Sequence, residues 1–288
     1  MKKISVIFAS LAVVFAMTSC DKMEEPYFNE PSVSESDTIK LEASDTVNFD
    51  GKVVVLLEDY TGIKCVNCPN AAVIANELEE LNEGHLVVLG VHPRTSFQDP
   101  GNSGLFPDFR TDDGETWRTN LGIGSAFPSG LVNRTGGVLT QASWTSAVGE
   151  IIGSDAPVRL IIKSAYDDAT RELRLSIHSK FLQPVESNDL RLTICMMEDS
   201  ITGRQVTPSG LDTAYVHRHV FRGTADGLSW GRMLDPQAGP IIEAGRNFIT
   251  NIKFNLSENY NDEQFYIVAF INDNNNNRVL MSAKKKIK

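Results

Sequence analysis

The pair Cys65 and Cys68, directly followed by Pro69, constrains the fold of this chain more than any other feature. The preceding run, residues 53–57, is short, apolar and β-branched, which predicts a buried strand. Pro69 is a favoured first residue of a helix. Apolar residues then recur at helical spacing before a stop at Gly84: Ala71, Ile74, Ala75, Leu78 and Leu81. The sequence therefore predicts a strand, a tight loop, a CxxC pair and a helix, in that order.

This placement of the two thiols suits redox chemistry. Thiols at this spacing can form a disulfide without moving the backbone far. The unpaired N–H groups and the positive dipole end of a helix N-terminus favour the thiolate, which is the nucleophile. We expect Cys65, with Lys64 beside it, to attack and Cys68 to resolve. A structural disulfide remains the alternative, whereas zinc is disfavoured because no second ligand pair has zinc-binding spacing.

The N-terminus predicts an export signal. Lys2 and Lys3 precede the apolar residues 4–17, a stretch too short to span a membrane comfortably, and Ser19-Cys20 follows. This pattern resembles a bacterial lipoprotein signal, which implies cleavage before Cys20 and lipid attachment to it. An ordinary secretory signal with another cleavage point is the alternative. In both cases the mature chain lies outside the cytoplasm, where disulfides persist.

The remaining cysteine bears on which disulfide can form, and the net charge bears on which partners the protein can bind. Cys195 lies in the apolar run 192–197 and is expected to be a buried small hydrophobe. Cys65–Cys68 is then the one intrachain disulfide that we expect. The formal net charge is −10, which argues against a nucleic-acid partner. Nothing in the sequence calls for a cofactor.

Composition divides the chain into four segments. Residues 1–19 are the predicted signal peptide. Residues 20–48 are predicted to be an acidic flexible tether, because positions 21–48 hold eight acidic residues against two lysines, with prolines and serines between them. The remainder is long enough for two domains, predicted at residues 49–154 and 155–288.

The first of these domains resembles the thioredoxin fold over residues 50–153. After the CxxC helix come six further features at the expected places: a strand at 85–91, a breaker-rich insertion at 93–116, a short helix at 115–121, Phe127-Pro128, a hairpin turn at 134–137 and a closing helix at 141–152. The resemblance implies that Pro128 is a cis-proline beside the disulfide.

The resemblance also assigns roles to residues. It makes Cys65, Cys68 and Pro128 the catalytic residues, with Phe127 and Lys64 as substrate contacts. Lys64 stands where the family usually has a tryptophan. The family's buried acid, which helps to deprotonate the resolving thiol, has Glu58 and Asp59 as candidates here. We expect both acids instead at a solvated strand end.

From Pro157 onward the apolar pattern changes to period two. Seven strands are predicted with no helix between them: 158–166, 172–182, 190–197, 215–221, 248–256, 265–272 and 278–287. This pattern suggests an immunoglobulin-like β-sandwich. The predicted fold class is therefore an α/β thioredoxin-like domain followed by an all-β immunoglobulin-like sandwich.

Two polar motifs in this second domain invite a metal interpretation. His217 and His219 would point to the same face of a strand and could bind a metal with a third ligand. The sequence offers His178 or nearby acids as a third ligand only by guesswork, so we expect a structural or interface role and no metal. The run 273–277 lacks the glycine and distal glutamate of an EF-hand loop and predicts a turn.

Three segments together resemble the twenty-eight-kilodalton outer-membrane protein family of the Bacteroidetes. They are the signal at Cys20, the CxxC segment 58–69 and the segment 215–220. The resemblance covers nearly the whole mature chain. It implies an outer-membrane protein anchored in the lipid bilayer through Cys20, on either the periplasmic or the surface side.

Two functions from different classes remain open. In the first, the protein is a thiol-disulfide oxidoreductase acting on envelope proteins. In the second, it is a surface adhesin or receptor for host proteins, as the family resemblance suggests, and Cys65–Cys68 is a fixed structural disulfide. The reduction potential of this cysteine pair is the measurement that best separates them.

Overall fold

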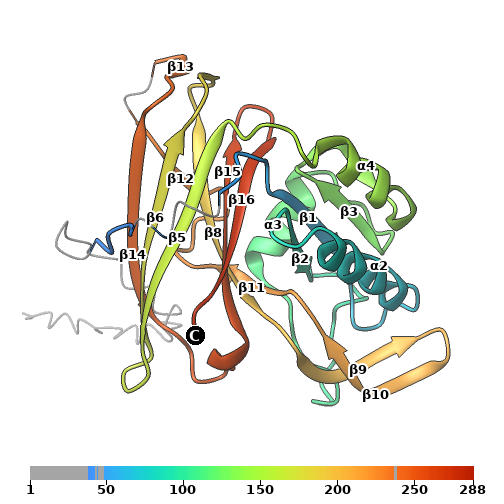
Figure 1. The fold of residues 1–288 in the computed structure, drawn as a ribbon. Helices are drawn as coiled ribbons and strands as arrows, with labels where there is room; N and C mark the ends of the chain where they lie inside the picture. Colours follow the sequence, from blue (N-terminus) through green and yellow to red (C-terminus); the bar gives the residue numbers. More distant parts are fainter. Residues whose placement is uncertain (1–37, 43, 45–48, 237–238) are drawn as a thin grey trace, which may run out of the picture.

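The computed structural model describes residues 38–42, 44, 49–236 and 239–288 (Figure 1). Most of this part is β-sheet, and helices are few. The predicted signal peptide, Cys20 and most of the predicted tether lie outside the described residues.

The N-terminal half is an α/β layer structure. Strand β1 (Val55–Tyr60) pairs in parallel with β2 (Leu86–Val91) and antiparallel with β3 (Ser129–Val132), which pairs antiparallel with β4 (Thr135–Leu139). The strand order is β2-β1-β3-β4. Helices α2 (Cys68–Leu81) and α4 (Trp144–Ile151, after the 3-10 turn Gln141–Ser143) pack on one face. Helix α3 (Asp112–Asn120) packs on the other face through Trp117.

Two boundaries in this half differ from those expected. Helix α3 begins earlier than residue 115, because Thr111 accepts a hydrogen bond from the Gly114 N–H at 3.0 Å and caps it. The hairpin turn lies at Asn133 and Arg134, with φ of 46° and 53°, rather than at 134–137. Two left-handed residues make the turn that best fits a two-residue hairpin, and Arg134 is held there by a buried partner described below.

The C-terminal half contains two sheets packed face to face. Strands β5 (Val158–Asp167), β6 (Glu172–Phe181) and β14 (Asn247–Asn255) form one, in the order β14-β6-β5. Strands β8 (Leu190–Glu198), β15 (Phe265–Asp273) and β16 (Val279–Lys286) belong to the other. Smaller strands complete this half: β7 (Val185–Glu186), β12 (Arg232–Met233) and β13 (Ile241–Ile242), with a 3-10 turn at Asp262–Gln264.

Strands β8 and β15 are buried on both faces. In β8, Ile194 and Met196 enter the core that faces β5 and β6, whereas Cys195 and Met197 enter a second core with Trp117. This double burial explains why both strands are almost continuously apolar in sequence, like strands covered on two sides. Cys195 is fully buried, which confirms the expectation for this residue.

The predicted strand 215–221 is interrupted. Strands β9 (Ile201–Thr207) and β10 (Gly210–His217) form a separate two-stranded hairpin, and β11 (Val220–Thr224) begins after a break. His219 causes the break, because its φ of 56° lies in the left-handed region and a strand cannot continue through it. The hairpin projects beneath α2 in Figure 1.

Strand β11 joins the two halves of the molecule. It pairs antiparallel with β8 and in parallel with β2, where Val220 lies opposite Gly90. The Gly90 N–H donates to the His219 carbonyl at 2.7 Å, and a Cβ at position 90 would lie 3.2 Å from that oxygen. One nine-stranded sheet therefore runs through both halves, in the order β16-β15-β8-β11-β2-β1-β3-β4 with β12 beside β8.

The last part of the predicted tether contacts the three-stranded sheet. The Ile39 N–H donates to Ser176 Oγ at 2.7 Å, and Asn251 Nδ2 donates to Thr38 Oγ1 at 2.7 Å. The chain thus enters the folded part over β6 and β14. Within the described residues, no helix has the length and apolar character needed to cross a membrane.

Candidate redox site

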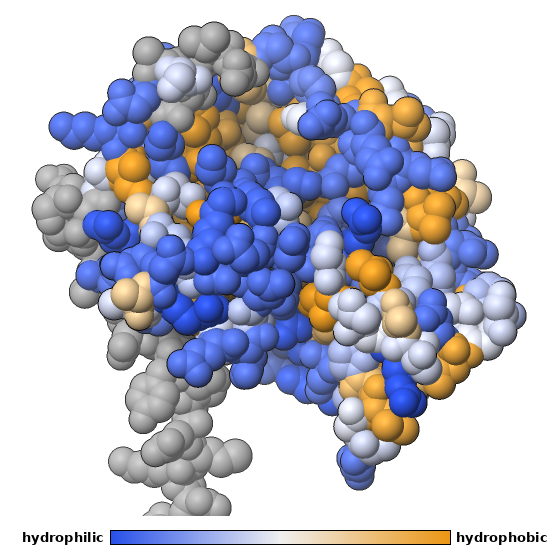
Figure 2. Space-filling model, turned by 60° about the horizontal axis from the view of Figure 1, so that its bottom comes forward, coloured by the Kyte–Doolittle hydropathy of each residue, from blue (hydrophilic) through white to orange (hydrophobic). Residues whose placement is uncertain are grey.

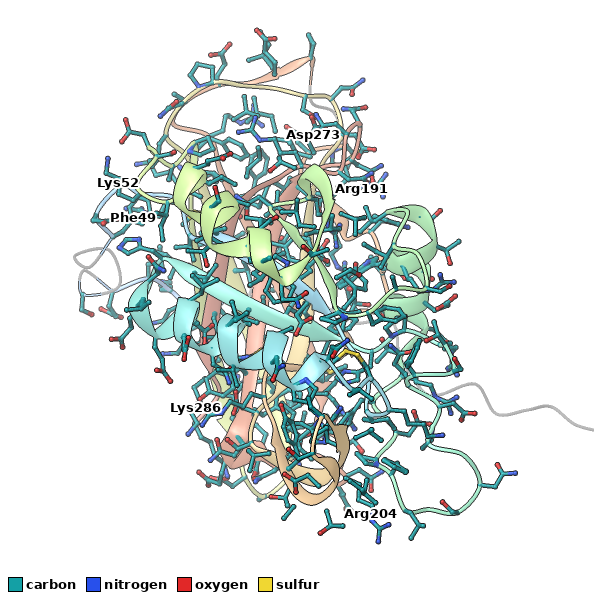
Figure 3. All side chains as sticks on the ribbon, turned by 90° about the vertical axis from the view of Figure 1, so that its right-hand side faces the viewer. Phe49, Lys52, Arg191, Arg204, Asp273 and Lys286 are labelled. Carbon is teal, nitrogen blue, oxygen red and sulfur yellow. A yellow bond between two sulfur atoms is a disulfide. The ribbon has the colours of Figure 1, made fainter. Side chains whose placement is uncertain are left out.

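Cys65 and Cys68 form a disulfide at the N-terminus of α2, with their Cα atoms 5.4 Å apart. Cys68 is the first residue of the helix and Pro69 follows it, while Cys65 lies in the preceding turn, where its N–H donates to the Gly62 carbonyl at 3.1 Å. The yellow bond in Figure 3 marks this position at the end of α2. The strand, loop, CxxC and helix therefore follow one another as expected.

The disulfide lies just beneath the surface. Each of the two cysteines is 2% exposed, whereas Val66 between them is 46% exposed. A thiol from another protein would therefore meet the loop around the disulfide before it met either sulfur.

Phe127 and Pro128 lie near the same loop, on the side of the insertion. The peptide bond between them is cis. The Phe127 ring contacts the Phe97 ring edge-on, with centroids 6.0 Å apart. The Phe97 carbonyl accepts a hydrogen bond from the Lys64 N–H at 2.9 Å. A chain of contacts thus leads from the cis-proline through Phe97 to the residue before Cys65.

The insertion at residues 93–116 rims the CxxC loop. Gln98 donates from its side-chain amide to the Thr61 carbonyl. A Cβ at Gly62 would lie 2.8 Å from the Phe97 carbonyl oxygen, so only glycine allows this approach. The Lys64 ammonium lies 5.6 Å from the centroid of the Phe106 ring. The expected cation beside Cys65 is therefore held over an aromatic ring of the insertion.

Glu58 and Asp59 are both buried, so the expectation of a solvated strand end is wrong. Strand β1 continues to Tyr60, which places both acids inside the central sheet. Successive strand residues point to opposite faces, and the two acids accordingly have different surroundings. Glu58 pairs with Arg134 on one side, with Nη2 and Oε1 2.8 Å apart, and Asp59 lies on the side of α2 and Cys68.

A small polar hollow lies behind the disulfide. Asp59, Cys68 and Pro69 line it together with further polar residues from α2, the loops after β1 and β2, the hairpin and the two residues that follow it: Thr61, Asn76, His92, Gln205, Tyr215, His217, Arg218 and His219. Among the described residues, four buried atoms of this lining have no hydrogen-bond partner: Asp59 Oδ1, Asn76 Oδ1, His92 Nδ1 and His217 Nε2.

Burial controls ionisation in this hollow, because it disfavours charged forms. It raises the pKa of Asp59 to about 7 and lowers the pKa of His217 to about 4. The pKa of His92 falls to about 3, through burial and the nearby His217. Asp59 can therefore both gain and lose a proton near neutral pH.

His217 and His219 are not two positions of one strand, because β10 ends at His217, so the expectation of a shared strand face is wrong. His217 packs edge-on against the rings of Phe109 and Tyr215, each with centroids 4.8 Å away. His219 lies beyond the end of β10 with a left-handed backbone, and its Nε2 lies 3.0 Å from Glu79 Oε2. In the part of the chain that the structure describes, no three His, Cys, Asp or Glu residues are grouped to hold a metal ion.

The β9–β10 hairpin contributes contacts that the sequence did not reveal. Gln205 is buried, and its Nε2 donates to the Gly62 carbonyl at 3.1 Å and the Cys65 carbonyl at 3.2 Å. The Val206 N–H donates to the Ile63 carbonyl at 2.8 Å. Figure 3 shows this hairpin, with Arg204 labelled, beside the end of α2 that carries the disulfide. No local pattern marks Gln205, because its partners at residues 62 and 65 are far away along the chain.

Comparison with known proteins identifies the family. The family model for the outer membrane protein Omp28 matches residues 118–288, more than half of the chain. The chain belongs to the Omp28 family. This confirms the family resemblance read from the sequence, and with it the localisation at the outer membrane.

The chain is also similar to several solved protein structures. HBP35 of Porphyromonas gingivalis is 17% identical, with a TM-score of 0.59, over 82% of this chain and 76% of that one. At this identity the likeness shows a shared fold alone. A domain of the outer membrane lipoprotein Omp28 from Porphyromonas gingivalis is 18% identical over 46% of this chain and 89% of its own, with a TM-score of 0.32.

A structure from Agrobacterium tumefaciens also matches, at 11% identity and a TM-score of 0.48, over 83% of this chain and 97% of that one. No curated protein matches the chain.

Proposed function

We propose that this outer membrane protein exchanges disulfides with proteins of the cell envelope through Cys65 and Cys68. The observation that carries the proposal is that a disulfide and a buried acid lie together at the N-terminus of α2. A disulfide opens α2, and a buried acid with a pKa of about 7 lies on the side of Cys68. A structural disulfide does not need a group beside it that donates or accepts a proton.

The arrangement of the N-terminal half supports this proposal. The strand order β2-β1-β3-β4, with α2 and α4 on one face and α3 on the other, resembles the thioredoxin fold. The cis bond before Pro128 lies where that resemblance implies it. The two packed sheets of the C-terminal half resemble an immunoglobulin-like sandwich, and we interpret them as a second module that positions the first.

The proposed exchange runs in two balanced steps. A thiolate of the partner attacks Cys65 Sγ, the Cys65–Cys68 bond breaks, and Cys68 leaves as a thiolate that takes a proton from Asp59. A second partner thiolate then attacks the partner's own sulfur in the mixed disulfide, which releases Cys65 and oxidises the partner. The same steps in reverse reduce a partner disulfide. A general acid with its pKa near the working pH is best suited to such transfers.

Trapping tests the proposal. With Cys68→Ala, the resolving thiol is gone, so mixed disulfides through Cys65 should accumulate in cells. Non-reducing gels should show adducts that disappear with reductant. The matched control is the Cys65→Ala/Cys68→Ala protein, which should form none. Absence of adducts in the single variant would contradict disulfide exchange.

The alternative is a surface adhesin or receptor with a lipid anchor at Cys20. One observation favours it: both cysteines are 2% exposed, as in a structural disulfide. The reduction potential separates the two functions, since structural disulfides of secreted proteins lie below about −300 mV. A potential in that range, together with unchanged binding of host proteins by the double variant, would establish the adhesin function.

A further inference from the structure

The β9–β10 hairpin lies across the loop that carries the two cysteines. Three carbonyls of that loop accept hydrogen bonds from β9: Gly62 and Cys65 from the Gln205 side chain, and Ile63 from the Val206 N–H. Gln205 is itself 4% exposed, so these bonds are shielded from water. Tyr215 and His217 of β10 line the same hollow as Cys68.

The hairpin is joined to the rest of the protein by side-chain packing and a few hydrogen bonds, not by sheet pairing. Its two strands pair with each other and with no strand of the nine-stranded sheet. Leu211 and Val216 on β10 are 49% and 45% exposed, so the described residues leave about half of each side chain uncovered. Figure 2 views the molecule from the end at which the hairpin lies, where apolar surface appears as separate patches among polar residues.

One end of the hairpin is fixed by a defined joint. His219 follows β10 with its left-handed backbone, its Nε2 lies 3.0 Å from Glu79 Oε2 and its N–H donates to Asp199 at 3.3 Å. A movement of the hairpin would therefore pivot at residues 218–219 and break the contacts of Gln205 and Val206 at the cysteine loop.

We infer that this hairpin is a strap that selects which thiols reach the disulfide, and that Gln205 is the residue that holds it closed. The inference rests on the proposed exchange function and adds the element that determines its selectivity. A thiolate must approach Cys65 Sγ in line with the bond that breaks. A small thiol can make that approach through the surface at Val66, whereas a folded protein must first displace the strap.

Reduction kinetics test the strap directly. The oxidised protein is reduced with dithiothreitol or with a bacterial thioredoxin, and the second-order rate constants are compared. Gln205→Ala removes two buried hydrogen bonds, so the rate with thioredoxin should rise on the order of tenfold. The rate with dithiothreitol should change far less. Thr202→Ala, at an exposed position of the same strand, is the matched control and should leave both rates unchanged.

Equal rates for Gln205→Ala and Thr202→Ala with thioredoxin would overturn the inference, and so would an equal rise with both reductants. Amide hydrogen exchange in the wild-type protein gives a second test that does not depend on a variant. The Val206 N–H should exchange much faster than amides of β8 and β15, because the strap opens without global unfolding. Equal protection would contradict the strap.

These results are distinct from those of the trapping experiment. If the rates respond to Gln205→Ala but Cys68→Ala traps no partner, the strap exists and the exchange function fails. If adducts form but the rates do not respond, the exchange stands and the strap fails.

Discussion

Arg134 donates two hydrogen bonds of 2.8 Å to Glu58, from Nε to Oε2 and from Nη2 to Oε1, and both side chains are buried. The guanidinium lies 4.9 Å from the Trp117 ring centroid and 5.0 Å from that of Phe270. Glu58 belongs to β1 and Phe270 to β15, so this ion pair lies where the two halves of the molecule meet.

Arg134→Met should destabilise the protein by about 3–5 kcal/mol, because it leaves the Glu58 carboxylate buried without a partner. Equilibrium unfolding in denaturant measures this loss. Arg94→Met is the matched control, since Arg94 pairs with the exposed Asp112 at the surface, and it should cost less than about 1 kcal/mol. The Glu58→Gln/Arg134→Met protein should lose less than the sum of the single changes; additive losses would contradict a coupled pair.

Asp59→Asn should stabilise the protein near neutral pH. Burial raises the pKa of Asp59 to about 7 from an ordinary value of 3.8, so the folded state holds a proton that the unfolded state releases between these values. The wild-type free energy of unfolding therefore falls as pH rises from about 4 to about 7. The variant lacks this fall, and its advantage should grow to on the order of 1–4 kcal/mol by pH 8. Parallel pH profiles for the two proteins would contradict a buried, protonated Asp59.

Glu79→Gln should show the opposite pH dependence. Burial alone would raise the pKa of Glu79, but the hydrogen bond and charge of His219, together with Lys284, lower it to about 2 from 4.5. Such a carboxylate stabilises the fold above about pH 4.5, and this stability is lost as pH falls toward 2.

The free energy of unfolding of the wild type should therefore exceed that of the Glu79→Gln protein by about 1–3 kcal/mol at pH 6, and the difference should shrink below pH 4. Glu83→Gln, at an exposed position near the end of the same helix, is the control and should show no such difference. A gap of constant size between pH 6 and pH 3 would mean that the ionisation of Glu79 does not contribute.

Cys20→Ala should release the protein from the membrane fraction, because the lipid that the signal implies cannot be attached. Fractionation followed by mass spectrometry of the N-terminus checks this prediction. Unchanged fractionation, with a free Cys20 thiol or cleavage elsewhere in the wild type, would show that the chain is held by other means.

Local patterns predicted much of this fold because their causes are local. The apolar alternation of residues 172–182 and the continuous apolar run at 265–272 correspond to β6 and β15, as expected. Pro69 and the helical spacing after it placed the start of α2 to within one residue of Cys68, where it begins. In each case, the residues that determine the element lie within the element itself.

The features that sequence reasoning missed depend on distant partners. From the sequence, Arg134 is only a turn residue. Its buried partner Glu58 is 76 positions earlier in the chain, so no local pattern predicts the pair. Gln205 lies in a polar stretch with weak strand character, and its role is defined only by carbonyls of residues 62 and 65. The alternation that placed His217 and His219 in one strand failed because β10 ends at His217 and His219 itself has a left-handed backbone.

Cutting the chain between residues 154 and 155 would separate strands that now cover each other's edges and apolar faces. Strand β2 would lose β11, and the face of β8 and β15 that packs on Trp117 would meet water. Unpaired strand edges and bare apolar faces promote self-association. Either half expressed alone should therefore be prone to aggregate, and insertions or fusions in this protein are better placed in surface loops than at the junction.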